Sequence, residues 1–293
     1  MPVIAQSCIM ALFGLAISMT DDEELSLGSP SLGVNVVTLT DTVDVFKKAG
    51  VKAPPTKTGV VLLEVAPYGP ADAASLRQMD VITRIDKIAV TTEDEFKTIV
   101  AKMEIGKECE VTGFRGMEVR GRLTWKRGTV KLKPVTLRDV YLNAMEETKD
   151  DITGESSFRH KDSPKALDSA SELFCYYTKK EGADPVLIMQ ILYVADEWLD
   201  IEKFTVKTDE RVFNLNATGI GDIERDTSGA KWLEWNRRVV GNAERPLLES
   251  IANSEHVTLR CYGSKYQKDR DLSEAEIERV KCVLTAFRIV SDK

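Results

Sequence analysis

The sequence predicts an α+β fold in two parts, and three observations support this prediction. Short segments rich in β-branched residues recur between residues 34 and 125, which indicates strands. Two other segments begin with Thr or Ser followed three residues later by Glu, a pattern typical of helix starts. A polar, turn-rich stretch at residues 148–164 then separates two regions of different texture. With 293 residues, the chain can form two hydrophobic cores.

The chain opens with an apolar run at residues 9–19, which has the length of the hydrophobic part of an export signal and is too short to span a bilayer. Ala16 and Ser18 supply small side chains at the spacing of a cleavage site, but no Lys or Arg precedes the run. Three interpretations stay open: a cleaved signal peptide, a helix packed on the body, or an incorrectly assigned start. If residues 1–18 are a signal, the protein is exported to the periplasm or cell envelope; otherwise it is cytoplasmic. No integral membrane span is predicted.

Residues 1–30 are predicted to be this apolar segment and an acidic linker, and residues 31–133 a strand-rich domain. Arg115-Gly116-Met117 is interpreted as a hairpin turn joining the last two strands of the domain. The strands are expected where β-branched residues cluster, at 34–38, 59–65, 81–85, 108–114 and 119–125.

Two helices are predicted inside this domain. A short one follows the turn at Pro70 and runs to Leu76. The second spans residues 92–103, where Thr92 and Glu95 have the spacing of a capping box. Its apolar residues recur at intervals of three and four, so they share one helical face; they are Phe96, Ile99, Val100 and Met103.

The remainder is predicted to be a helix and polar linker at residues 134–163, followed by a separate α+β domain at 164–293. Helices are expected at 137–147, 166–179 and 186–199, the last with Pro185 in its first turn. Ser273 and Glu276 form a second capping box, followed by an apolar stripe to Phe287. Strands are expected at 201–206, 211–215, 232–240 and 256–262.

The order of motifs in the first domain resembles the PDZ domains of bacterial HtrA-type proteases. Ser31-Leu32-Gly33-Val34 precedes a strand, and the segment 59–71 reads as strand, turn and short helix. Residues 79–86 (MDVITRID) are similar to the strand and turn written GDVI…ING in that family. The resemblance covers about 100 residues, and it implies a partly open β-barrel or sandwich with two helices.

The sequence departs from the family pattern at three turns. Ala74-Ser75-Leu76 replaces the usual Ala-Gly-Leu, Met79-Asp80 replaces Gly-Asp, and Asp86-Lys87 replaces Asn-Gly. Loss of glycine at a turn implies either an altered backbone or an Asp that accepts a positive φ.

The resemblance also implies a peptide-binding groove between strand 34–38 and helix 92–103. A ligand would add as a strand, and its terminal carboxylate would be bound by backbone N–H groups of a glycine loop. Leu32, Gly33 and Val34 would form this carboxylate loop. Val36, Phe96, Ile99 and Val100 are candidates for lining the pocket of the last ligand side chain, but the same residues are also candidates for the core. Protein C-termini or extended peptide segments are therefore the expected partners; the oligomeric state is not predicted.

No catalytic residue, metal site or cofactor is predicted. The chain contains no Gly-x-Ser-x-Gly motif, zinc-protease motif or Walker A loop, and only two histidines, His160 and His256, far apart. Five scattered cysteines favour buried apolar roles over disulfides or metal ligation. Forty basic residues against 47 acidic ones give a net charge of −7, which argues against binding nucleic acid.

The leading hypothesis is a non-catalytic adaptor, whose PDZ-like module captures peptides and whose second domain binds another protein. The competing hypothesis is a hydrolase, or another enzyme of unrecognised type, in residues 164–293, with the PDZ-like module selecting substrates. In a third, the chain's own N-terminal segment occupies the groove.

Overall fold

The structure is a computed structural model that describes residues 27–48, 52–119, 122–164, 170–216 and 223–291. The described residues form two compact units, which divide between Ala144 and Met145, inside the segment predicted to join two domains. Residues 1–18, for which a signal peptide is one of three interpretations, lie outside the described residues. The hypothesis that the N-terminal segment occupies the groove concerns the same undescribed part of the chain. No helix among the described residues is long and apolar enough to cross a membrane.

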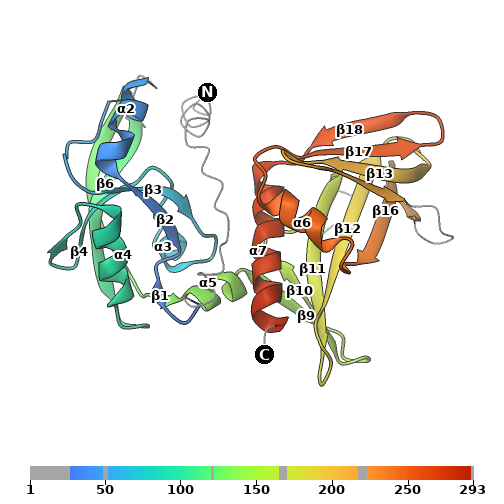
Figure 1. Ribbon diagram of the computed structural model, residues 1–293, viewed down its shortest axis with the longest axis horizontal. Coiled ribbons are helices and arrows are strands. Elements are labelled where there is room, and N and C mark those ends of the chain that lie inside the picture. Colours follow the sequence, from blue (N-terminus) through green and yellow to red (C-terminus); the bar gives the residue numbers. More distant parts are fainter. Residues whose placement is uncertain (1–26, 49–51, 120–121, 165–169, 217–222, 292–293) are drawn as a thin grey trace. The chain divides into compact units, whose positions relative to one another are not determined.

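Unit 1 (residues 27–144) is built on an antiparallel sheet with strand order β2-β3-β4-β6-β7, and β5 pairs with β4 (Figure 1). A short pair, β1 with β8, closes one end. The strands are β1 (Pro30–Ser31), β2 (Val34–Thr38), β3 (Val60–Val65), β4 (Val81–Ile85), β5 (Ile88–Ala89), β6 (Cys109–Val119), β7 (Arg122–Leu132) and β8 (Val135–Thr136). The helices are α2 (Leu39–Lys48), α3 (Pro70–Ala73), α4 (Glu93–Ala101) and α5 (Leu137–Asn143).

The structure confirms the predicted α4 and its cap, because the Thr92 hydroxyl accepts a hydrogen bond from the Glu95 N–H. The hairpin of β6 and β7 is longer than predicted. Arg115 lies in mid-strand opposite Lys126 and is not in a turn. Helix α2 was not predicted. Its Thr- and Val-rich sequence has weak helix propensity, and burial of Leu39 and Phe46 stabilises the helix instead.

The turns that lack the family's glycines nevertheless keep a left-handed backbone. Ser75 has φ 61°, Met79 has φ 69° and Asp86 has φ 51°. The predicted positive φ at an Asp is therefore confirmed, and the backbone is retained at Ser75 and Met79 without glycine. Asp86 is stabilised locally, since its carboxylate accepts a hydrogen bond from the Glu110 N–H at 2.8 Å.

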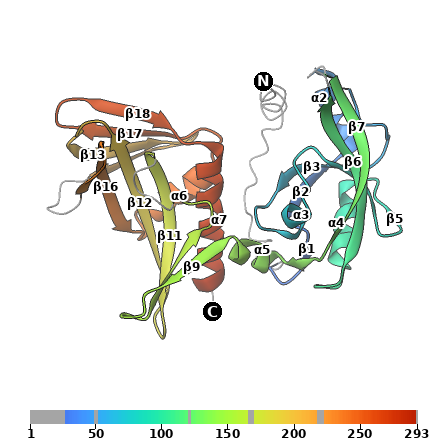
Figure 2. The same cartoon turned by 180° about the vertical axis from the view of Figure 1, so that it is seen from behind.

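The described residues of unit 2 (145–164, 170–216 and 223–291) form two antiparallel sheets and two helices, α6 (Arg245–Ala252) and α7 (Glu274–Ser291). One sheet has the order β15-β16-β12-β11-β10-β9, and the other β14-β13-β17-β18. Figures 1 and 2 show α7 lying along β11 and β10, with α6 beside it. The strands are β9 (Met145–Lys149), β10 (Glu155–His160), β11 (Glu172–Lys180), β12 (Val186–Ala195), β13 (Ile201–Lys207), β14 (Val212–Asn216), β15 (Glu224–Ser228), β16 (Lys231–Val239), β17 (Thr258–Gly263) and β18 (Gln267–Asp271).

Two predictions for this unit are wrong. The stretch 148–164 is not the predicted linker, because it contains the end of β9 and the whole of β10, which pair as sheet strands. Helices were expected at 166–179 and 186–199, where the described residues form the hairpin of β11 and β12. Glu172 to Tyr177 are all buried, so both faces of β11 are covered and the apolar residues do not alternate. Such continuous runs do not distinguish a buried strand from a helix.

Four of the five cysteines lie in the described residues, and all four are buried and outside disulfides, as predicted; they are Cys109, Cys175, Cys261 and Cys282. Cys109 belongs to unit 1 and the other three to unit 2. Burial raises the pKa of the Cys109 thiol to about 11 and that of Cys261 to about 12.

Candidate functional site

The candidate site lies where α4 runs beside β2. Strand β2 is at the end of its sheet and pairs with β3 alone among the described strands. Helix α4 lies next to β2 (Figure 1), and the Glu93 N–H at its start donates to the Thr38 hydroxyl at 3.0 Å. Because α4 also contacts β1, which precedes β2, the helix spans the length of this edge. A strand edge without a second strand partner, lying beside a helix, can accept an extended chain.

A tight turn precedes the edge strand, and Gly33 gives it its shape. Gly33 has φ 68°, a conformation that other residues adopt only under strain. The carbonyls of Leu32 and Gly33 face the protein body, where Ala71 N–H donates to the first at 3.0 Å and Ala66 N–H to the second at 2.8 Å. The Gly33 N–H donates to the Ser31 hydroxyl at 3.0 Å. This N–H is thus already engaged by an oxygen acceptor.

The structure brings the seven predicted site residues together, with different exposure. Four of their side chains are core residues, with exposures of 2% for Leu32, 5% for Val36, 4% for Phe96 and 8% for Val100. Val34 and Ile99 are only partly buried and pack against the same cluster. Contact of a ligand with any of them stays a prediction, and Val34 and Ile99 have the surface for it.

Sequence reasoning missed two polar groups at this site. Ser31 engages the N–H of the glycine turn, and Thr38 anchors the start of α4. Ser31 stands two residues before Gly33 in the motif itself. For Thr38 no sequence signal was available, because its partner Glu93 is 55 residues away.

Acidic side chains occupy the first turn of α4, at the end of the helix near Thr38. Glu93 pairs with Lys97 at 2.7 Å. Hydrogen bonds from the Thr91 side chain and backbone lower the pKa of Glu95, which keeps that exposed carboxylate charged. The start of α4 therefore carries negative charge, while the residues that the helix packs against β2 are apolar.

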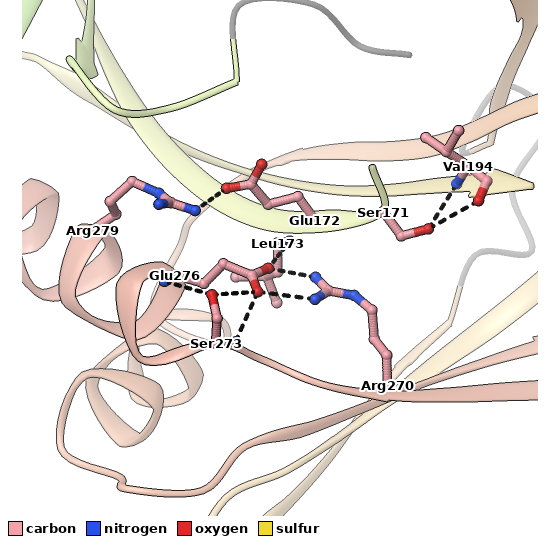
Figure 3. A network of polar contacts seen from close by, with 8 residues as sticks. All are labelled: Ser171, Glu172, Leu173, Val194, Arg270, Ser273, Glu276 and Arg279. Carbon is pink, nitrogen blue, oxygen red and sulfur yellow. Dashed lines mark hydrogen bonds and ion pairs between the residues drawn. The ribbon is translucent and has the colours of Figure 1, made fainter. Parts of the chain in front are cut away.

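A second cluster of charged residues lies in unit 2 (Figure 3), with two buried carboxylates and two partly exposed arginines. Glu276 pairs with Arg270 at 2.6 Å and accepts from the Ser273 and Leu173 N–H groups; Glu172 pairs with Arg279. Burial raises the pKa of Glu172, and its pairing with Arg279 opposes the shift. Burial acts in the same direction on Glu276, but hydrogen bonds from Arg270, Ser273 and Leu173 outweigh it and the pKa of Glu276 is lowered.

Comparison with known proteins assigns the first unit. Unit 1 combines an edge strand, a left-handed glycine turn and a helix beside that strand. Residues 30–121 match the family model of the PDZ domain, so this part of the chain is a PDZ domain, as the sequence predicted. No curated protein matches the chain.

The chain is also similar to solved structures, two of which are as follows. An HtrA-type protease, AlgW, with a decapeptide is 23% identical, with a TM-score of 0.30, over 37% of this chain and 29% of that one. The HtrA3 PDZ domain bound to a phage-derived ligand (FGRWV) is 16% identical, with a TM-score of 0.28, over 36% of this chain and 84% of that one. The chain thus spans less than a third of the length of the AlgW chain.

Proposed function

We propose that the PDZ domain binds C-terminal or extended peptide segments of other proteins by strand addition to β2, and that the protein acts as a non-catalytic adaptor. The observation that carries the proposal is the edge of β2, which begins at the Gly33 turn and is flanked by α4. Backbone hydrogen bonds along the edge would supply affinity, and partly exposed Val34 and Ile99 would supply apolar contacts. A short peptide loses much conformational freedom on binding, so we expect modest affinity.

A peptide library tests this proposal on the full chain, with each peptide made with a free carboxylate and with an amidated C-terminus. We expect the free carboxylates to bind at least about tenfold tighter, since a charge-assisted hydrogen bond contributes roughly 1.5–3 kcal/mol. Equal binding of the two forms would leave strand addition without carboxylate capture. Binding of neither form would contradict the proposal.

A matched pair of variants on α4 locates the bound peptide. Ile99→Glu places a charge on the partly buried side chain beside the groove, whereas Thr98→Glu places the same charge on an exposed neighbour. We expect Ile99→Glu to abolish peptide binding and Thr98→Glu to leave it within about twofold. Equal effects of the two variants would place the peptide elsewhere.

The non-catalytic part of the proposal is supported by the charged cluster of unit 2. Glu172 and Glu276 are each held by an arginine inside the fold, as structural ion pairs are. The competing proposal, an enzyme in unit 2, would use these carboxylates as acid and base. Turnover of ester, phosphoester, peptide or glycoside substrates that is lost in Glu172→Gln, while the variant stays folded, would favour the enzyme.

A further inference from the structure

A cavity of about 270 Å³, open to solvent on one side, lies in unit 1 between the β6–β7 hairpin, the start of β4 and the segment after α3. None of the seven groove residues is among the described residues that line it. Its walls are largely apolar and include Leu76, Ile82 and Val130. A cavity of roughly 150 Å³ lined by apolar groups is enough to bind benzene. This space is therefore larger than a packing defect and smaller than a site for a drug-sized ligand.

Two glycines are paired across the strands that line the cavity, and they have different roles. Gly113 of β6 lies opposite Gly128 of β7. A Cβ on Gly113 would stand 2.0 Å from the Val81 carbonyl oxygen, so glycine is required there for β4 to approach β6. A Cβ on Gly128 would meet nothing within 4 Å. The backbone of Gly128 therefore forms part of the floor of the cavity, and a side chain at this position would enter the space without a clash.

Positive charge lies next to this apolar space. Side chains alternate along a strand, so residues of the same face as the two glycines are Val111 and Arg115 on β6 and Val130 and Lys126 on β7. Arg115 and Lys126 are direct cross-strand partners, an arrangement of like charges that is unfavourable by itself. Asp80 relieves it in part, since Arg115 Nε donates to its carboxylate at 2.8 Å. An anion beside Lys126 would relieve it further.

We propose that this cavity binds a small amphipathic carboxylate, an alkyl chain of medium length whose head group lies beside Lys126 and Arg115. The alkyl chain would lie over Gly128 against the apolar walls. Arg115 is held in place by a second hydrogen bond, from Nη2 to the Ser75 carbonyl at 2.6 Å, so the cationic rim is preorganised. The proposal does not depend on peptide binding in the groove.

Titration of the full chain with octanoate, and with octanol as its neutral counterpart, tests the proposal by NMR or calorimetry. We expect octanoate to bind with a dissociation constant of roughly 0.1–1 mM and at least about fivefold tighter than octanol. Gly128→Val should abolish binding of both, because the side chain fills the cavity, and should leave peptide binding unchanged. Valine suits a strand, and Gly128 is not among the glycines with positive φ.

Lys126→Gln should remove the preference for octanoate and keep the binding of octanol. Lys131→Gln is the matched control, since Lys131 lies on the same strand but on the opposite face, paired with Glu108 at 2.8 Å. No binding of octanoate at 10 mM (about ten times the weakest expected constant), equal binding of octanoate and octanol, or unchanged binding in a folded Gly128→Val would each overturn the proposal.

Discussion

Left-handed residues in the turns of the PDZ domain show how much a single position can hide from sequence reasoning. Ser75 and Met79 stand where the family has glycine, and both keep the positive φ that glycine would allow. A non-glycine residue in this conformation costs about 1 kcal/mol or more. The order of the remaining motifs still predicted the fold of the first unit. Packing in the folded domain then holds Ser75 and Met79 in the conformation that their side chains disfavour.

Replacing Ser75 by glycine should therefore stabilise the protein. We expect Ser75→Gly to raise the free energy of unfolding of unit 1 by about 0.5–1 kcal/mol, measured by urea denaturation. Ala73→Gly, at a nearby exposed position with helical backbone, is the control and should lower it by a similar amount. Destabilisation by both variants would show that the Ser75 side chain has a contact worth more than the strain.

The two capping boxes were predicted as residue pairs, but not the full role of each glutamate. Ser273 and Glu276 do bond reciprocally, the Glu276 N–H to the hydroxyl at 3.2 Å and the Ser273 N–H to the carboxylate at 2.9 Å. Glu276 also accepts from the N–H of Leu173, which is 103 residues away. Spacing along the chain predicts local bonds; this distant one arises only when the sheet is assembled.

The lowered pKa of Glu276 predicts a loss of stability in acid. Its carboxylate contributes stability above the unfolded pKa of about 4.3, and this contribution is lost as the pH falls through the lower folded pKa. We expect Glu276→Gln to lower the free energy of unfolding at pH 7 by about 2 kcal/mol and to flatten its dependence on pH below about 4.5. Glu274→Gln, at an exposed position in the same turn, should do neither.

At the scale of elements, the sequence predicted the helices and strands whose signals are local. It missed those that depend on pairing with a distant strand. Helices α4 and α7 have caps and an apolar stripe, and the structure confirms both. Strands β9 and β10 are mostly polar on their exposed faces, so nothing local distinguished them from a linker; they exist because each pairs with a neighbour. The groove was predicted through the family resemblance, since its strand and helix are far apart in sequence.

The hydrogen bond between α4 and β2 should set the width of the groove. Thr38→Val keeps the size of the side chain and removes the acceptor of the Glu93 N–H. We expect a loss of about 1 kcal/mol in stability, as for a lost helix cap, and peptide binding weakened by at least threefold. Thr98→Val, on the exposed face of α4, is the control for stability and binding. If Thr38→Val is destabilised but binds peptide with unchanged affinity, the hydrogen bond between Thr38 and Glu93 stabilises the fold without shaping the groove.

At the scale of the whole molecule, each unit has a core of its own. The main cluster of unit 1 gathers around Leu62 and Ile82, and unit 2 buries Val280 and Val283 of α7 completely. Separate cores favour separate unfolding transitions. Val280→Ala should therefore lower the free energy of unfolding of unit 2 by about 1–3 kcal/mol. In calorimetry, one transition should move to a lower temperature and the other should stay in place. One transition that shifts as a whole would indicate that the units unfold together.

Each unit contains buried cysteines, whose alkylation rates can report how often that unit opens. A thiol that is protonated and enclosed reacts with an alkylating agent only when its surroundings open. The rate of alkylation of Cys109 therefore reports the opening of the PDZ domain. The rates for Cys175, Cys261 and Cys282 report the opening of the second unit. Mass spectrometry of each cysteine during slow alkylation of the native chain would follow the opening of both units in one sample, without mutations. A bound peptide should slow the alkylation of Cys109 alone among these four cysteines.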